Sequence, residues 1–241
     1  MPKITALHIY PVKGAKGLSQ SSIRINAATG VEGDRQTAIV KRSAPLGKWT
    51  NRGLYSAIST PQIANLVPDP TNAPEALRQA LDLPNPPATL QAEGRFNFTY
   101  TKGPTVSLLN LATHRLFEKF LQEKSLFPEP LDPERFRMNI QIDGWEPFAE
   151  LDLVDTFPGT REITIGNLRF QVQDACERCK VTHANPATGI YDFATVPLLK
   201  QFMQKYRPEY ISPRNRRSFV MGLILVPLDT GTLNCGDALR L

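Results

Sequence analysis

Proline limits the elements that this chain can form more than any other residue. The 241 residues include 21 prolines, and a proline inside a helix or a central strand removes a backbone hydrogen bond. Six prolines stand between residues 68 and 87, where only a short helix fits, with Asn72 as its cap and Pro74 in its first turn. We therefore expect a boundary in this tract, with residues 1–90 and 91–241 as two domains.

The first of these domains is rich in short β-branched segments. Runs at residues 4–10, 21–27 and 36–41 have the composition of strands, and turns around Gly30 and Gly33 separate them. Short strands of this kind remove their exposed edges most simply by closing on themselves. We therefore expect the part of the chain before the proline tract to be all-β, and the first domain to be barrel-like.

The second domain contains two segments with helical periodicity. Apolar residues at helical spacing predict a helix over residues 107–124, with Thr105 or Ser107 as its cap. A second helix is predicted from Pro197, with Thr195 as a possible cap.

Strand-like segments make up much of the rest of the second domain. Alternating apolar residues on both sides of the dipeptide Gly166-Asn167 predict a two-residue hairpin over residues 162–172. Two more strand-like runs, 218–228 and 235–241, close the chain. The predicted fold class is β-rich α+β, in which an N-terminal β-barrel-like region packs with a second β-barrel that carries a few helices.

Composition excludes several classes of protein. With 41% hydrophobic residues the chain can bury a core, which rules out disorder for most of it. Lys and Arg exceed Asp and Glu by five, which suits an anionic ligand but is weak for a dedicated nucleic-acid binder. Three cysteines without a signal peptide favour a reducing compartment. We expect a cytoplasmic protein with no nucleic-acid partner and no membrane association.

Four arginines gather before the run at residues 218–228, at Arg207, Arg214, Arg216 and Arg217. Plain solvation is the simplest interpretation of such a cluster. The functional alternatives are the rim of an anionic pocket or a docking face for an acidic redox partner.

The segment at residues 174–189 is polar and turn-rich, and it carries the groups best suited to chemistry. It holds two of the three cysteines, Cys176 and Cys179. The thiolate is the reactive form of cysteine, and Arg178 and Lys180 would lower the pKa of Cys179 if their side chains point toward it. Cys179 is therefore the better candidate for an activated thiol.

The residues alone leave three interpretations of this segment open. The first is half of a zinc site, made by Cys176, Cys179 and His183, with Cys235 or a distant histidine as the fourth ligand. The second is a redox dithiol, although no thioredoxin-like pattern surrounds it. The third is a pair of cysteines with no role beyond packing.

A fourth interpretation comes from the order of short motifs along nearly the whole chain, which resembles the MOSC family of molybdenum-cofactor proteins. The matching segments are IxxLxIYPVKGxKG at 4–17, GVEGDRQ at 30–36, KWTNR at 48–52, SLLN at 107–110, FRMNI at 136–140, ERCKVTHANPATG at 177–189 and GTLNCGDALRL at 231–241. The resemblance implies a MOSC N-terminal β-barrel region over the first domain and the MOSC domain proper over the second.

The resemblance also implies a site for the molybdenum cofactor, a pterin dithiolene with a terminal phosphate. Cys179 matches the family's metal ligand and would be the catalytic thiol, since a soft thiolate suits a metal already bound by sulfur. Basic side chains would hold the phosphate and the dithiolene, and amides and hydroxyls would hold the pterin. Seven residues match the family's cofactor contacts: Lys13, Gly14, Arg35, Ser107, Asn110, Arg137 and Asn139.

Each of these assignments has a simpler alternative. Lys13 and Arg35 could be solvated charges of turns, and Arg137 could form a surface ion pair with an acidic residue of 132–134. Asn110 could be an ordinary polar residue on a helix. Gly14 stands where the family often has serine, so only its backbone N–H could make that contact.

The function implied is that of a molybdenum-dependent oxidoreductase. The resemblance is to the mitochondrial amidoxime-reducing component and to bacterial reductases of N-hydroxylated bases, which remove an oxygen atom from small N-hydroxylated substrates. A four-cysteine cluster motif is missing, so the electron donor would be a separate flavin, haem or iron–sulfur protein. The alternative is a non-catalytic cofactor carrier or sulfur-handling protein, because the same fold occurs in molybdenum-cofactor sulfurases.

Overall fold

The computed structural model describes residues 1–41, 54–92, 98, 103–126, 130–154, 161–211 and 219–241. The strands are β1 (Lys3–Ile9), β2 (Leu18–Gln20), β3 (Ser22–Asn26), β4 (Gly30–Val31), β5 (Thr37–Val40), β6 (Ala88–Gln91), β7 (Val106–Asn110), β8 (Ile140–Asp143), β9 (Glu162–Ile165), β10 (Leu168–Glu177), β11 (Val220–Pro227), β12 (Gly231–Asn234) and β13 (Leu239–Arg240). The α-helices are α1 (Ala73–Ala80), α2 (Leu111–Glu123) and α3 (Thr195–Tyr206).

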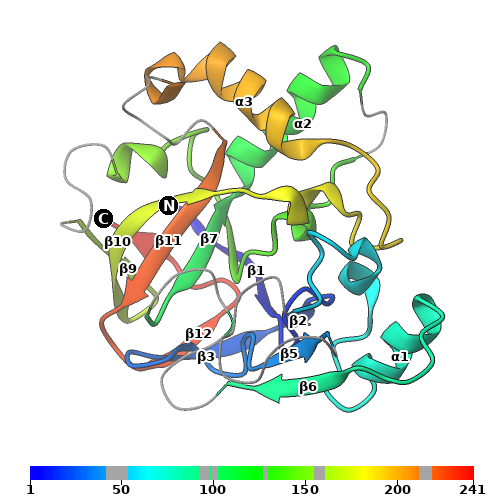
Figure 1. The fold of residues 1–241 in the computed structure, drawn as a ribbon. Coiled ribbons are helices and arrows are strands. Elements are labelled where there is room, and N and C mark those ends of the chain that lie inside the picture. Colours follow the sequence, from blue (N-terminus) through cyan, green and yellow to red (C-terminus); the bar gives the residue numbers. More distant parts are fainter. Residues whose placement is uncertain (42–53, 93–97, 99–102, 127–129, 155–160, 212–218) are drawn as a thin grey trace.

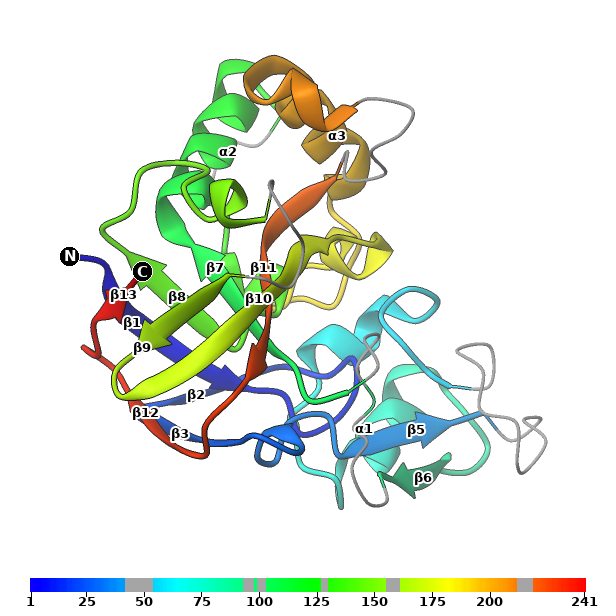
Figure 2. The ribbon, with the colours of Figure 1, turned by 90° about the vertical axis from the view of Figure 1, so that its left-hand side faces the viewer.

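One large curled sheet dominates the fold. Its eight strands run in the order β13-β9-β10-β11-β7-β8-β1-β2, and only the β7–β8 pair is parallel. Two smaller sheets, β12-β3-β4 and β5-β6, lie with α1 at the opposite end of the molecule from α2 and α3 (Figures 1 and 2). The predicted β-rich α+β class is confirmed.

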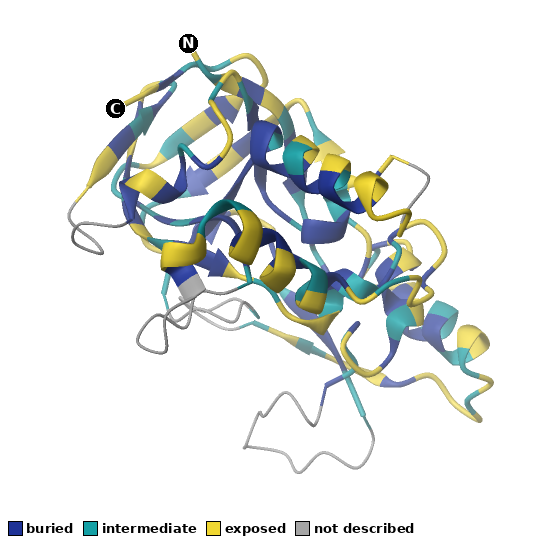
Figure 3. Ribbon diagram, turned by 90° about the horizontal axis from the view of Figure 1, so that it is seen from above, coloured by how far each residue is buried: buried dark blue, intermediate teal, exposed yellow. Residues whose placement is uncertain are grey.

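The large sheet and the helices α2 and α3 share the main hydrophobic core. The Phe202 ring lies 5.2 Å from Phe117 and 5.6 Å from Phe120, measured between ring centroids. The inner faces of the two helices are buried and their outer faces are exposed (Figure 3). Aromatic contacts of this kind stabilise packing beyond the area that they bury, and they fix the helices at one end of the sheet.

A second, smaller core lies beside the large sheet. It gathers Val12, Ile39, Ile63 and Leu77 with several small residues of the first part of the chain. Ala184, from the segment that contains the cysteines, packs in the same core. The cysteine segment is therefore anchored to the N-terminal part of the chain by apolar contact.

The strands of both predicted domains share sheets. In the large sheet β1 pairs with β8, so that Leu7 lies opposite Ile140, and in the small sheet β3 pairs with β12, so that Ile23 lies opposite Leu233. The domain boundary near residue 90 stays a prediction.

The predicted helix over residues 107–124 is wrong in its first turn. Residues 106–110 form β7, and the helix begins only at Leu111. All five residues of β7 are buried between β11 and β8, and a fully buried strand shows no alternation that would separate it from a helix. The cap is therefore neither Thr105 nor Ser107 but Asn110, whose side-chain oxygen accepts the Ala112 N–H at 3.1 Å.

The strand-like run predicted at 235–241 forms a strand only at β13, because residues 235–236 lie in a turn. The predicted hairpin and the other helices agree with the structure except at their caps. The hairpin of β9 and β10 turns at Gly166-Asn167, where Gly166 has a φ of +59°. The helix α3 begins at Thr195, but the Thr195 hydroxyl donates to the Thr182 carbonyl at 2.7 Å and caps nothing. The Asn72 side chain makes no cap hydrogen bond to α1.

Two of the predicted features cannot be compared with the structure. The motif at 48–52 and the arginines at 214, 216 and 217 lie outside the described residues. Within the described parts of the chain, the helices are all too short or too polar to cross a membrane.

Candidate functional site: a basic cluster beside an exposed thiol

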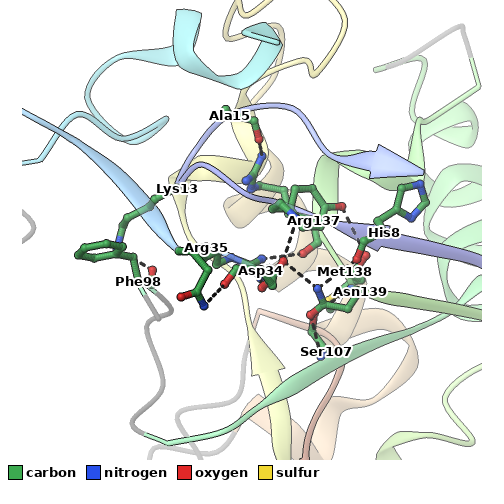
Figure 4. A network of polar contacts seen from close by, with 12 residues as sticks. His8, Lys13, Ala15, Asp34, Arg35, Phe98, Ser107, Arg137, Met138 and Asn139 are labelled. Carbon is green, nitrogen blue, oxygen red and sulfur yellow. Dashed lines mark hydrogen bonds and ion pairs between the residues drawn. The ribbon is translucent and has the colours of Figure 1, made fainter. Parts of the chain in front are cut away.

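Three turns bring the predicted basic residues to one place (Figure 4). Lys13 follows β1, Arg35 precedes β5, and Arg137 ends the 3₁₀ turn Pro133–Phe136. Arg35 and Arg137 both have left-handed backbones, with φ values of +49° and +53°. This conformation costs a non-glycine residue about 1 kcal/mol, and such strained residues gather at functional sites.

Both arginines of this cluster lie against the buried ring of Tyr10. The Arg137 guanidinium carbon is 4.4 Å from the ring centroid, and that of Arg35 is 5.0 Å from it. Burial raises the pKa of Tyr10 far above its usual value, so the phenol stays neutral. A neutral aromatic ring attracts each cation through its quadrupole, and this attraction offsets part of the repulsion between the two guanidinium groups.

Asp34 is the carboxylate in direct contact with this cluster. It is 1% exposed, and one of its oxygens accepts from the Arg35 guanidinium. The other oxygen accepts from the Tyr10 N–H at 2.8 Å and from the Asn139 side-chain amide at 3.1 Å. Asp34 thus fixes Arg35 while it cancels only one of the positive charges.

Asn139 and Ser107 form the support beneath Asp34. The Ser107 hydroxyl and backbone N–H both donate to Asn139 Oδ1, at 2.8 and 3.2 Å. Asn139 Nδ2 donates to the His8 carbonyl and to Asp34. These bonds use all four hydrogen-bonding positions of the amide. Contact of Asn139 and Ser107 with a cofactor stays a prediction, and in this arrangement both act on the scaffold.

Backbone carbonyls hold Arg137, and the part of the chain that the structure describes gives it no carboxylate in hydrogen-bonding contact. Its Nη1 donates to the carbonyls of Gly14, at 3.2 Å, and of Ala15. Its Nη2 is enclosed and has no hydrogen-bond acceptor among the residues that the structure describes. Burial, and next the charge of Arg35, lower the pKa of Arg137 to about 10. The suggested surface ion pair is wrong, because Glu134 lies instead 3.4 Å from His8.

Lys13 is likewise not a solvated turn charge. It is half-buried, and its ammonium donates to the Phe98 carbonyl at 3.1 Å. Burial and the charge of Arg35 lower the pKa of Lys13, and the Cys179 sulfur raises it. The Cys179 thiol therefore lies within electrostatic range of the Lys13 ammonium.

Cys179 stands exposed at the start of the 3₁₀ turn Lys180–His183. Its sulfur also contributes, after burial, to the raised pKa of Tyr191 on the far side of the loop. The Thr182 hydroxyl and backbone N–H both donate to the Cys179 carbonyl, at 2.9 and 3.0 Å. The loop therefore presents the sulfur on a hydrogen-bonded backbone.

Arg178 points away from Cys179, which corrects one expectation. Its Nη1 lies 2.8 Å from the Cys176 sulfur, and its Nη2 donates to the Phe136 carbonyl. Side chains alternate between the two faces of an extended chain, so Arg178 shares the inner face with Cys176. The cation whose interaction with Cys179 is resolved is Lys13.

Asn110 lies outside the basic cluster, whereas Gly14 contacts it through its carbonyl oxygen. Asn110 lies three residues beyond Ser107 along β7, about 10 Å away, where its side chain caps α2 and donates to Glu150 at 2.7 Å. Gly14 has a φ of +90°, and a Cβ there would lie 3.1 Å from Ile63. This explains the absence of serine at position 14.

The zinc interpretation finds no support in the described residues. They contain no group of three or more His, Cys, Asp or Glu side chains that could hold a metal ion. Cys235 lies elsewhere, with its sulfur 3.6 Å from the Gln20 carbonyl.

Sequence reasoning missed two residues of the site, Tyr10 and Asp34, although both stand in the motifs at 4–17 and 30–36. Tyr10 meets Arg137 only through the fold, so no local pattern reveals its role. The acidic neighbour of Arg35 in the Gly-Asp-Arg turn was the one available hint.

Comparison with known proteins supplies the family. A model of the MOSC domain matches residues 99–240. The molybdenum cofactor sulfurase of Drosophila ananassae is 31% identical over 136 residues, covering 55% of this chain and 15% of the sulfurase. That of Drosophila melanogaster is 30% identical over 141 residues, covering 55% and 16%. The chain thus matches only a small part of the length of these relatives.

The solved structures that align with this chain are more distant in sequence. The YuaD protein from Bacillus subtilis aligns with a TM-score of 0.42 and 12% identity, over 99% of this chain and 94% of that one. YiiM from Geobacillus stearothermophilus aligns with a TM-score of 0.34 and 16% identity, over 56% and 53%. Since the domain model matches more than half of the residues, the chain belongs to the MOSC domain family.

Proposed function

We propose that this protein binds the molybdenum cofactor and uses it as an oxidoreductase that removes the oxygen atom from small N-hydroxylated substrates. The observation that carries the proposal is the guanidinium of Arg137, which is held by carbonyls and keeps a donor without an acceptor among the described residues. A buried cation without a counter-ion is costly, and an anionic ligand supplies the missing charge.

The residues present fit such a ligand. Lys13, Arg35 and Arg137 bring three positively charged side chains together, and the carboxylate of Asp34 forms an ion pair with Arg35. Guanidinium groups suit phosphate because they donate in a fork. The exposed Cys179 thiol beside them is a soft ligand suited to a metal that dithiolene sulfurs already bind. The cofactor in the name of the sulfurase relatives agrees with this donor set.

The chain's own residues have separate tasks in this proposal. Lys13 and Arg137 would bind the anionic part of the cofactor, Asp34 keeps Arg35 oriented, and both guanidinium groups lie against the Tyr10 ring. Cys179 holds the metal at the solvent-facing side of the cluster, where a small substrate can reach it. When bound, the cofactor supplies a two-electron redox centre.

The overall reaction determines how many electrons and protons must be supplied. Cleavage of an N–O bond consumes two electrons and two protons and releases the amine and water. A separate electron-donor protein with a flavin, a haem or an iron–sulfur cluster would deliver the electrons, and the protons would come from solvent at the exposed face.

The thiol itself supplies the decisive test. Protein from a molybdenum-replete host is expected to carry molybdenum and pterin in stoichiometric amounts and to reduce an N-hydroxylated amidine with reduced viologen. We expect the Cys179→Ser variant to lose both the metal and turnover, while the Cys235→Ser variant, which changes an exposed cysteine elsewhere, keeps both. Elemental analysis and pterin fluorescence measure the loading. A folded wild-type protein without either component would overturn the proposal.

The sulfurase relatives favour a second candidate, a carrier that binds the cofactor without catalysis. It predicts full loading of the wild-type protein and no turnover with reduced viologen. The same assay therefore separates the two functions.

A further inference from the structure

A second arginine stands two residues before Arg137 and faces the other way. Arg135 is 2% exposed, and its Nη1 and Nη2 donate to the two oxygens of Asp192 at 2.7 and 2.6 Å. Its guanidinium carbon lies 4.6 Å from the centroid of the Phe193 ring. This paired, charge-assisted geometry is the strong form of an arginine–carboxylate contact.

Arg135 also binds the backbone of the loop that carries the thiol. Its Nη1 lies 3.3 Å from the Thr182 carbonyl and 3.2 Å from the His183 carbonyl. Thr182 in turn donates twice to the carbonyl of Cys179. A continuous series of hydrogen bonds therefore runs from the Arg135 guanidinium to the backbone of Cys179.

One short segment of chain carries both the arginine that binds the thiol loop, Arg135, and the arginine of the basic cluster, Arg137. Arg135 and Arg137 flank Phe136, which is fully buried, and Arg137 takes the left-handed conformation that turns its side chain into the basic cluster. A displacement of the cysteine loop relative to this segment would change the distance between the Cys179 sulfur and the basic cluster.

We infer that the Arg135–Asp192 pair is a positioning clamp, which fixes the Cys179 sulfur relative to Arg137 and so sets how firmly the site retains a metal. The assignment deepens the proposed function and rests on it for the identity of the metal. Arg135 does not touch the cofactor: it acts through Thr182.

Two variants separate the parts of the clamp. Arg135→Lys keeps the positive charge but loses the fork, and Asp192→Asn keeps the shape of the carboxylate but not its charge. Arg169→Lys is the matched control, because Arg169 makes the same kind of forked contact with Asp229 on an exposed part of β10.

Amide hydrogen exchange of the cofactor-free protein measures how firmly the clamp holds the loop around Thr182. We expect the amides of residues 180–184 to exchange roughly tenfold faster in Arg135→Lys and in Asp192→Asn, and unchanged in Arg169→Lys. In the double variant the effect should not exceed that of either single change, because the two residues act as one unit. Unchanged exchange in both single variants would overturn the clamp.

Cofactor retention distinguishes positioning from a general loss of structure. The clamp predicts faster loss of molybdenum from the loaded variants, while binding of the metal-free pterin, which needs the basic cluster and not the thiol, is unchanged. Parallel loss of metal and pterin together with a lower Tm would assign Arg135 a purely structural role. If Arg135→Lys fails to fold, the Asp192→Asn variant tests the clamp instead. Asp192 is partly exposed, so its substitution should disturb the fold less.

The two proposals fail separately. Faster exchange in the variants of a protein that never contains molybdenum would keep the clamp and reject the proposed function. Normal exchange in variants of a protein that loses molybdenum on Cys179→Ser would do the reverse.

Discussion

Glu150 is a buried acid that couples the stability of the fold to pH. It is fully buried, and it accepts hydrogen bonds from Asn110 at 2.7 Å and from the Thr113 hydroxyl at 3.0 Å. Burial, only partly offset by these two bonds, raises the pKa of Glu150 to about 7. The group is therefore a neutral acid in the folded protein at a pH where it ionises in the unfolded chain.

The sign of the pH dependence follows from this raised pKa. Between about pH 4.5 and pH 7 the folded state keeps a proton on Glu150 that the unfolded chain releases, so the contribution of this group to the free energy of unfolding falls as the pH rises, by up to about 3 kcal/mol in total. In Glu150→Gln this contribution should vanish, which makes the variant more stable than wild type at pH 8 and equal to it near pH 4. Urea denaturation across this range measures the effect. Identical slopes in both proteins would contradict it.

At the scale of the element, Gly222 in β11 shows how closely the strands of the large sheet approach. It has a φ of +81°, and a Cβ there would lie 2.2 Å from the Leu108 carbonyl oxygen of β7. A clash with a backbone carbonyl cannot be relieved by a change of rotamer, as a clash with the end of a flexible side chain can. The pairing of these two strands therefore depends on a missing side chain.

We expect Gly222→Ala to lower the free energy of unfolding by about 4 kcal/mol, which is exceptional for a single methyl group. Gly236→Ala is the control, because Gly236 has a similar φ of +93° and a Cβ added there would meet nothing within 4 Å, and strain alone costs about 1 kcal/mol. Chemical denaturation of both variants isolates the contact. Equal losses would mean that the sheet relaxes around the methyl group.

The elements also show which parts of the structure local sequence could predict. The β9–β10 hairpin followed from Gly166-Asn167, because a two-residue turn needs only its own residues. The strand β7 did not, because its burial comes from β11 and β8, which lie far away in sequence. The same holds for the site: Lys13, Arg35, Arg137 and Cys179 stand in short motifs, whereas Arg135 acquires its role only from partners 47 to 57 residues further on.

At the scale of the whole molecule, the cysteine loop joins two hydrophobic cores. Ala184 packs in the smaller core, while Phe193 packs against the larger one. The Tyr191 hydroxyl lies within hydrogen-bonding distance of the carbonyls of Ala57 and of Ile58, the latter at 2.6 Å. The segment around the thiol thus couples the two parts of the fold.

Tyr191→Phe removes the hydroxyl that contacts the carbonyls of Ala57 and Ile58 and keeps the aromatic ring. We expect a loss of about 1 kcal/mol in the free energy of unfolding and faster amide exchange in both 57–66 and 180–191. Tyr210→Phe is the control, since the Tyr210 hydroxyl donates to the Leu151 carbonyl at 3.0 Å within the larger core, and it should leave 57–66 unchanged. Exchange that rises in only one of the two segments after Tyr191→Phe would show that the cores are independent.

The two guanidinium groups that lie against the Tyr10 ring have a consequence for ligand binding. The charges of Arg35 and Arg137 repel each other, and the Asp34 carboxylate forms its ion pair with Arg35. A ligand with two negative charges should therefore raise the melting temperature of the protein more than a neutral ligand of the same size does. High ionic strength should reduce this difference.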